Sequence, residues 1–114
     1  MERLKRRADF LAAASGNKAS AAGFLLQARV QDEGQAVRVG FTVSKRTGNA
    51  VERNRIRRRL REIVRLNGPS DMKAGHDYVL IGRRDALTLP FTRMTAELTR
   101  ALKRVHAGSK AART

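Results

Sequence analysis

The stretch from Lys45 to Arg65 holds the densest set of side chains that could bind a partner through charge. It contains nine Lys or Arg residues, against which stand only Glu52 and Glu62. A surface helix normally mixes signs and gains stability from opposite charges three or four residues apart. Here like charges repel one another, so an anionic partner explains the stretch better than solubility alone does. Because guanidinium groups bind phosphate oxygens bidentately and stack on bases, a nucleic-acid backbone is the favoured anion.

A helical pattern follows the loop Lys45–Asn49 and separates apolar from basic residues. At 100° per residue, four apolar side chains fall on one narrow stripe: Ile56, Leu60, Ile63 and Val64. The remaining surface carries Asn54, Arg55, Arg57, Arg58, Arg59, Arg61 and Arg65. The pattern predicts a helix that buries its stripe and displays its charge. A purely solvated basic face is the alternative interpretation.

Groups able to catalyse hydrolysis are sparse. The chain has ten acidic residues, which are scattered, and two histidines, His76 and His106. Neither histidine has a partner at metal-ligand spacing, and the absence of cysteine excludes disulfides and thiolate sites. A protein nuclease needs clustered carboxylates or histidine acids and bases. We therefore expect no catalytic and no metal-binding residue, and a chain that is not catalytic by itself.

Composition limits the class of protein. The 114 residues are enough for one domain with one modest core, and a net charge of +15 predicts binding to polyanions. Phe and Tyr make up only 4% of the chain, which argues against extensive base stacking. No apolar run approaches the ~20 residues of a membrane span, and no signal-peptide pattern opens the chain. We expect a cytoplasmic protein that does not bind membranes.

The first half of the chain predicts a helix and then a sheet with two different faces. The elements expected are a helix over Glu2–Ala14, a short edge strand over Lys18–Gly23, a strand over Phe24–Val30, a turn at Asp32–Gly34 and a strand over Val37–Ser44. Alternation places one apolar set on the core face: Phe24, Leu26, Ala28, Val30, Val37, Val39, Phe41 and Val43. The other face would carry Leu25, Gln27, Arg29, Arg38, Gly40, Thr42 and Ser44. This second face is either simply solvated or, since several of its residues are small, open to an extended ligand.

The second half predicts a crossover connection and a final helix. The basic helix is expected to stop at Asn67–Pro69, and the apolar run in His76–Gly82 is typical of a central strand. A strand, a helix and a strand in succession favour parallel pairing. Pro90 opens a last helix, and the sequence from Gly108 onward indicates a disordered basic tail. The domain is thus expected over residues 1–107 and the flexible tail over 108–114.

The loop and the basic helix resemble those of the bacterial ribonuclease P protein subunit. The residues that carry the resemblance are Val37–Phe41, Ser44–Arg46, Gly48–Val51, Arg53-Asn54-Arg55, Arg57, Arg58 and Arg61. Arg-Asn-Arg at the head of a basic helix, after such a strand and loop, is a specific combination. With Asp9-Phe10 and the order of elements, the resemblance extends over residues 1 to about 106.

The resemblance implies a fold and a function. It implies a single α+β domain with a mixed sheet of three to four strands, three helices, an α-β-β-β-α-β-α order and a left-handed βαβ crossover, against the usual hand. The implied partners are the catalytic RNA of ribonuclease P, which removes the 5′ leader from precursor tRNA using Mg²⁺, and the precursor tRNA. Mg²⁺ would act through the RNA, without a dedicated protein site. The protein would assist cleavage, lower the Mg²⁺ requirement and be monomeric without RNA.

The resemblance also implies two sets of binding residues. Those that would hold the catalytic RNA are Lys45, Arg46, Arg53, Asn54, Arg55, Arg57, Arg58 and Arg61. Those that would hold the single-stranded leader in a cleft are Phe10, Leu25, Thr42 and Ser44. Ala14 and Gln27 stand where the family often has aromatic residues, so leader stacking is expected to be reduced. A ribosomal or other RNA-binding protein and a DNA-compacting protein also fit the charge, but neither explains the motif.

Overall fold

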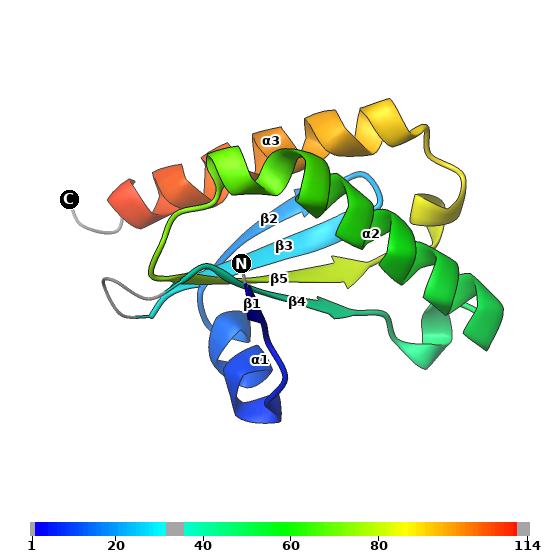
Figure 1. Ribbon diagram of the computed structural model, residues 1–114, viewed down its shortest axis with the longest axis horizontal. Coiled ribbons are helices and arrows are strands. Elements are labelled where there is room, and N and C mark those ends of the chain that lie inside the picture. Colours follow the sequence, from blue (N-terminus) through cyan, green and yellow to red (C-terminus); the bar gives the residue numbers. More distant parts are fainter. Residues whose placement is uncertain (1, 32–35, 112–114) are drawn as a thin grey trace.

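The computed structural model describes residues 2–31 and 36–111, without the side chains of 68–70 and 108–111. Its elements, in chain order, are β1 (Glu2–Arg3), α1 (Arg7–Ala14), β2 (Asn17–Ala21), β3 (Phe24–Val30), β4 (Arg38–Thr42), α2 (Ala50–Asp71), β5 (His76–Gly82) and α3 (Phe91–Ala111), with short 3-10 turns at Lys45–Thr47 and Arg84–Leu87 (Figure 1). The expected single α+β domain with three helices is confirmed. None of these helices combines the length and apolar character needed to cross a bilayer.

The strands form one mixed sheet in the order β1-β4-β5-β3-β2. β4 pairs parallel to β5 and to β1, whereas β3 is antiparallel to β5 and to β2. In register, Leu80 lies between Leu26 and Phe41, so the alternating residues of three strands meet on one face. The connection from β4 through α2 to β5 is left-handed, as expected from the resemblance (Figure 1).

The expected strand number, three to four, was too low, because the sheet has five strands. The difference arises at the N-terminus, where a helix was expected from Glu2. Instead, the backbone N–H of Glu2 donates to Val37 O at 2.8 Å and that of Leu4 to Val39 O at 3.0 Å. Glu2 and Arg3 thereby form a strand that pairs with β4 at the edge of the sheet, and α1 begins only at Arg7. A strand of two residues is too short to show a period of two in the sequence.

Both long helices extend beyond the predicted stops. α2 continues past Asn67–Pro69 to Asp71, and Met72 just beyond it is buried in the main core. Val64 before the glycine and proline and Met72 after them are both buried, and this burial outweighs the poor helix propensity of those two residues. α3 continues past Gly108, where the tail was expected to begin, to Ala111. The predicted turn at Asp32–Gly34 and the last residues of the predicted tail, 112–114, lie outside the described residues.

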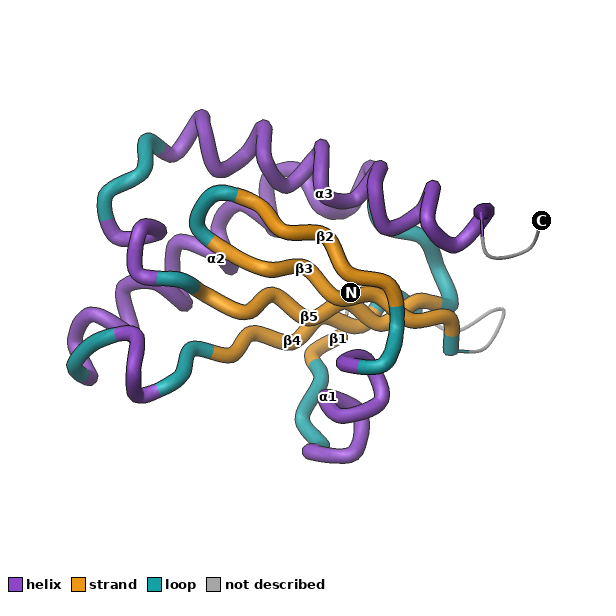
Figure 2. Tube along the Cα trace, turned by 180° about the vertical axis from the view of Figure 1, so that it is seen from behind, coloured by secondary structure: helices purple, strands orange, loops and turns teal. Residues whose placement is uncertain are grey.

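The two faces of the sheet are covered differently. α2 and α3 lie on one face and enclose the main core, in which Phe24, Leu26, Leu60, Leu80 and Leu98 are fully buried. The short α1 lies on the opposite face, as the two views show (Figures 1 and 2). Beneath it is a small apolar cluster of Leu4, Ala13 and Val79, against which Phe10 and Ile81 pack. The sheet therefore separates a large apolar layer from a thinly covered surface.

Candidate nucleic-acid interface

Hydrogen bonds fix the start of the basic helix. The N–H of Glu52 donates to Asn49 Oδ1 at 2.8 Å, and the N–H of Asn49 donates to Glu52 Oε1 at 3.0 Å, which is a capping box. Arg84 pairs with the same carboxylate at 2.9 Å. Hydrogen bonding from Arg84, and then from the Asn49 backbone, lowers the pKa of Glu52. The loop before α2 is thereby tied both to the helix and to the turn after β5.

The apolar stripe of α2 is buried as the sequence predicts. Ile56, Leu60 and Ile63 have no exposed surface, and Val64 is 3% exposed. Since these side chains point into the core, most of the basic residues must point away from it. The residues with exposed side chains among those predicted to bind catalytic RNA are Lys45, Arg46, Asn54, Arg55, Arg58 and Arg61.

Arg53 and Arg57 are only half-exposed and make contacts within the protein. Arg53 Nη1 donates to Gly48 O at 2.8 Å, and Arg57 Nη1 donates to Asn54 Oδ1 at 3.0 Å. Arg53 thus helps to hold the loop, while Arg57 orients the asparagine of the Arg-Asn-Arg sequence. Neither residue forms an ion pair within the described part of the chain, so both retain an unneutralised positive charge.

Three of the predicted residues meet in one hollow. Asn54, Arg58 and Arg61 line an open depression of about 390 Å³ on α2. Burial, followed by the positive charges of Arg3, Arg57 and Arg58, lowers the pKa of Arg61. The structure therefore concentrates positive charge here beyond what the helix alone supplies, since Arg3 comes from β1.

Arg59 differs from its neighbours, although the sequence places it in the same basic series. Its Nη1 donates to Leu87 O at 3.4 Å and its Nη2 to Leu89 O, and its guanidinium lies 5.9 Å from the centre of the Phe91 ring. It therefore attaches α2 to the chain that leads into α3. No sequence signal distinguishes it, because its partners are remote in the chain.

A groove of about 460 Å³ lies between α1 and the exposed face of the sheet. From the N-terminal segment it is lined by Lys5, Arg7, Phe10, Leu11 and Ala14, and from the strands by Gln27, Phe41, Thr42, Val79 and Ile81. Two predicted leader-binding residues, Phe10 and Thr42, are thus brought together. Leu25 does not line the groove, but it pairs in register with Ile81, which is one of the lining residues. Ser44 lies beyond β4 and is exposed, with its hydroxyl 3.2 Å from that of Thr47.

Phe10 both lines the groove and packs on the sheet. Its ring lies over Gly40, where an added Cβ would come within 2.6 Å of two ring atoms. Only glycine allows this approach, and the same ring is half-buried against Leu4, Ala13 and Val79. The groove also contains Ala14 and Gln27, so the positions that lack aromatic residues do lie beside Phe10.

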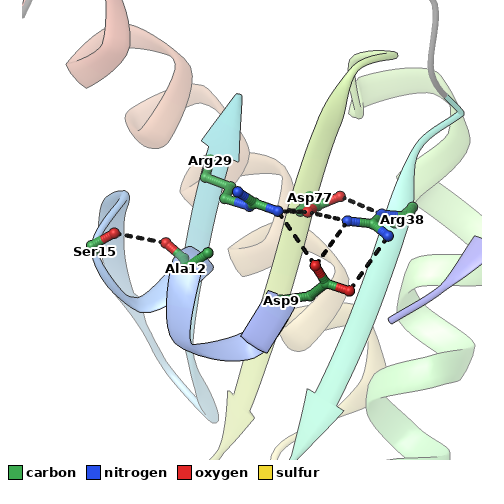
Figure 3. Close-up of polar contacts among 6 residues, drawn as sticks. All are labelled: Asp9, Ala12, Ser15, Arg29, Arg38 and Asp77. Atoms are coloured by element: carbon green, nitrogen blue, oxygen red, sulfur yellow. Dashed lines mark hydrogen bonds and ion pairs between the residues drawn. The ribbon is translucent and has the colours of Figure 1, made fainter. Parts of the chain in front are cut away.

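A charged cluster that sequence reasoning missed attaches α1 to the sheet. The Asp77 side chain on β5 is fully buried and pairs with Arg29 at 3.0 Å and with Arg38 at 2.8 Å (Figure 3). Asp9 of α1 approaches the same guanidiniums at 3.5 and 3.4 Å. Hydrogen bonding to Asp77 raises the pKa of Arg38. An acid within an apolar central strand, flanked by arginines in both neighbouring strands, is the signal that could have predicted it.

Fold and surface together define a class of protein: a small basic α+β domain with a left-handed crossover, a charged helix on one side and a groove on the other. The profile of the Ribonuclease P family matches residues 1–106. The ribonuclease P protein component of Ruegeria pomeroyi is 50% identical over 107 residues, covering 91% of this chain and 86% of that protein. That of Paramagnetospirillum magneticum is 49% identical over 115 residues, covering 96% and 86%.

Solved structures agree with the sequence comparison. The ribonuclease P protein of Thermotoga maritima superposes with a TM-score of 0.76 at 30% identity, covering 92% of this chain and 98% of that one. The protein from Staphylococcus aureus gives 0.73 at 29% identity, covering 90% and 94%. The chain belongs to the ribonuclease P protein family and is the protein component of a ribonucleoprotein endoribonuclease of tRNA processing, which associates with the ribonuclease P RNA.

Proposed function

We propose that the chain assists the catalytic RNA in removing the 5′ leader from precursor tRNA, by binding that RNA through α2 and the leader in the groove beside α1. One observation carries the proposal: a single small domain presents two chemically different surfaces. One is a helix with unneutralised guanidiniums, and the other is a partly apolar groove with cations at its rim. A protein that only neutralised a polyanion would not need the groove.

The catalytic-RNA surface comprises Lys45, Arg46, Arg53, Asn54, Arg55, Arg57, Arg58 and Arg61. Arg55 and Arg58 support this role most directly, because both are exposed and neither has an ion-pair partner within the described part of the chain. Each guanidinium can pair with a phosphate through two charge-assisted hydrogen bonds. The capping box holds the loop that carries Lys45 and Arg46 in a fixed position relative to the helix.

The leader would lie along the groove as a single strand. Phe10 offers one ring for stacking, Thr42 a hydroxyl, and Lys5 and Arg7 positive charge for the phosphates. Since Ala14 and Gln27 supply no second ring, a base can stack on one side only. In this proposal Leu25 supports the floor at Ile81, and Ser44 contacts the strand beyond the groove.

We propose that Mg²⁺ is held by the RNA and that the protein contributes no catalytic group. In the part of the chain that the structure describes, no three His, Asp or Glu side chains come together as metal ligands would. The 25 Lys and Arg residues would replace part of the cation atmosphere that two RNAs need to associate, which lowers the Mg²⁺ requirement. The net charge of +15 disfavours self-association, so the protein would be monomeric before it binds RNA.

Reconstitution tests the proposal. Purified chain freed of RNA, catalytic RNA alone and the two together are incubated with precursor tRNA over a range of Mg²⁺ concentrations. Cleavage at low Mg²⁺ is expected only when both components are present, with tighter binding of precursor than of mature tRNA. Cleavage by RNA-free protein that survives nuclease treatment would overturn the non-catalytic role. An unchanged Mg²⁺ requirement and equal affinity for both tRNAs would overturn the assisting role.

A further inference from the structure

A second hollow connects the groove with the basic helix. It measures about 150 Å³ and has four cationic side chains in its lining, Arg3, Lys5, Arg57 and Arg61. The rest of the lining is apolar and consists of Leu4, Phe10, Val39, Gly40 and Phe41. Lys5 and Phe10 also line the larger groove, whereas Arg61 also lines the depression on α2. The three concave surfaces therefore adjoin one another through these shared residues, and we call the middle one the junction hollow.

The hollow exists because of the short strand β1. The pairing of Arg3 with Val39 places the N-terminal segment beside β4, and Leu4 is buried, which anchors that segment. Arg57 and Arg61 are four residues apart on α2 and hence on one face of the helix. Had the first residues formed a helix, Arg3 and Lys5 would not have been fixed at this edge.

The charges in the junction hollow are not neutralised within the protein. Among the described residues, none of the four cations forms an ion pair, and Arg57 has one hydrogen bond, to the neutral Asn54 side chain. Burial and the charges of Arg3, Arg57 and Arg58 lower the pKa of Arg61, which is the electrostatic effect expected of crowded cations. An anion in the hollow would relieve this repulsion.

We propose that the junction hollow binds a phosphodiester group of the leader strand, at the point where the strand leaves the groove and turns toward α2. The inference rests on the proposed function. A phosphate is an anion that guanidinium and ammonium groups bind through charge-assisted hydrogen bonds, so four cations around a hollow of about 150 Å³ suit a phosphate better than a neutral base. The hollow shares Lys5 and Phe10 with the groove but only Arg61 with the depression on α2, which favours the leader over the catalytic RNA as the source of that phosphate.

The test uses the reconstituted holoenzyme and the variant Arg3→Gln, because Arg3 lines the junction hollow but not the groove. A matched control, Arg93→Gln, removes the same charge from an exposed position on α3. We expect the first variant to bind precursor tRNA about tenfold more weakly, with a salt dependence shallower by about one unit per lost phosphate contact. Affinity for mature tRNA and for catalytic RNA should be unchanged, as should every affinity of the control.

A neutral methylphosphonate placed at one leader linkage at a time locates the phosphate. In the wild-type holoenzyme a methylphosphonate at one linkage is expected to weaken binding, and in the Arg3→Gln variant the same linkage should have a smaller effect. The melting temperature of the variant should stay equal or rise, because like-charge repulsion is removed.

Three results would overturn the inference: unchanged precursor affinity, an equal loss for precursor and mature tRNA, or a loss confined to catalytic-RNA binding. The last would assign the phosphate to the catalytic RNA. If the wild-type holoenzyme itself fails to distinguish precursor from mature tRNA, the proposed function is wrong. If it does distinguish them and the variant behaves like wild type, only the junction hollow is excluded.

Discussion

The two faces of the sheet are stabilised by different forces. On the face under α2 and α3, long apolar side chains such as Leu60, Leu80 and Leu98 are completely buried. On the other face, α1 buries only Ala13 fully and is attached largely through Asp9 and the arginines around Asp77. Burial of apolar side chains holds α2 and α3 on the sheet, whereas ion pairs provide much of what holds α1.

This difference separates stability from binding. A face covered by two amphipathic helices has no room for a ligand, but a face covered by eight residues of α1 leaves the adjoining groove open. The thin cover is stabilised by ion pairs that occupy little space. We therefore expect substitutions on the face under α2 and α3 to change the free energy of unfolding. Substitutions of exposed residues on α2 and in the groove should instead change RNA affinity.

The largest effect is expected from Leu60→Ala in the main core. The variant should lose about 2 to 5 kcal/mol of unfolding free energy, through lost burial and the cavity left behind. Leu4→Ala beneath α1 should lose about 2 kcal/mol, because a small cluster at the edge relaxes more easily. Urea denaturation measures both values. A greater loss at Leu4 than at Leu60 would contradict the comparison.

Asp77→Asn is expected to cause the next largest loss of stability, and it tests whether ion pairs hold α1 on the sheet. Removing the buried carboxylate leaves Arg29 and Arg38 with only their longer contacts to Asp9, at a cost of about 3 kcal/mol, near the low end for a broken buried pair. Their side chains are 28% and 23% exposed, so water compensates in part. Glu62→Gln breaks a solvent-screened surface pair with Arg65 and should leave the unfolding midpoint nearly unchanged. Similar unfolding midpoints for the two variants would show that the buried cluster contributes little.

Arg58→Ala should affect binding rather than folding. We expect catalytic-RNA affinity to fall by about 1 to 3 kcal/mol and the slope of log affinity against log salt to become shallower by about one unit. Its exposure and lack of a partner within the described residues predict an unchanged melting temperature. Arg93→Ala on α3 serves as the control. Equal affinities and slopes in wild type and Arg58→Ala would leave a solvated basic face as the explanation.

Phe10→Leu should affect the groove alone. Leucine retains apolar contact with Leu4 and Ala13 but cannot stack on a base, so precursor affinity should fall by about 1 kcal/mol. Mature tRNA should bind as before, and the melting temperature should change little. Loss of stability with equal weakening toward both tRNAs would make the ring purely structural, which its position over Gly40 makes a real alternative.

The smallest expected effect is a pH dependence of stability that arises at His106 in α3. The Tyr78 hydroxyl lies 2.7 Å from His106 Nε2, and burial, followed by the charges of Lys73 and His76, lowers the pKa of His106. The unfolded chain therefore binds a proton more readily than the folded protein. Stability should be constant above about pH 6.5 and fall as the pH drops below it. His106→Gln should flatten this part of the curve in thermal melts at several pH values, and an unaltered curve would exclude His106 as its origin.

Strong periodic patterns allowed much of the fold to be predicted. The bounds of β3 and β5 agree with the prediction, because residues on both sides of each strand are covered and both strands have apolar sequences. The buried stripe of α2 also follows from spacing alone. β1 was missed because its pairing depends on β4, which follows some 35 residues later, and two residues carry no periodicity.

The residues of the site also differ in how far the sequence could predict their positions. Phe10 and Thr42 were brought to the groove as the family resemblance implied, whereas Arg3 and Lys5 were not considered because they were assigned to a helix. Arg59 and Asp77 illustrate a further limit. The partners of Arg59 are remote in the chain, so local spacing could not reveal its role, whereas the role of Asp77 could be predicted only together with the strand order that places Arg29 and Arg38 on either side of it.

The cluster around Asp77 has a consequence for the order in which the molecule assembles. Arg29 and Arg38 reach Asp77 only after β3 and β4 have both paired with β5, and only then is there a completed site for Asp9. We therefore expect α1 to dock after these strands have paired and to detach before they separate. Its amide hydrogens should exchange through a local opening while those of β5 exchange only on global unfolding, which makes α1 a separate cooperative unit of the native ensemble.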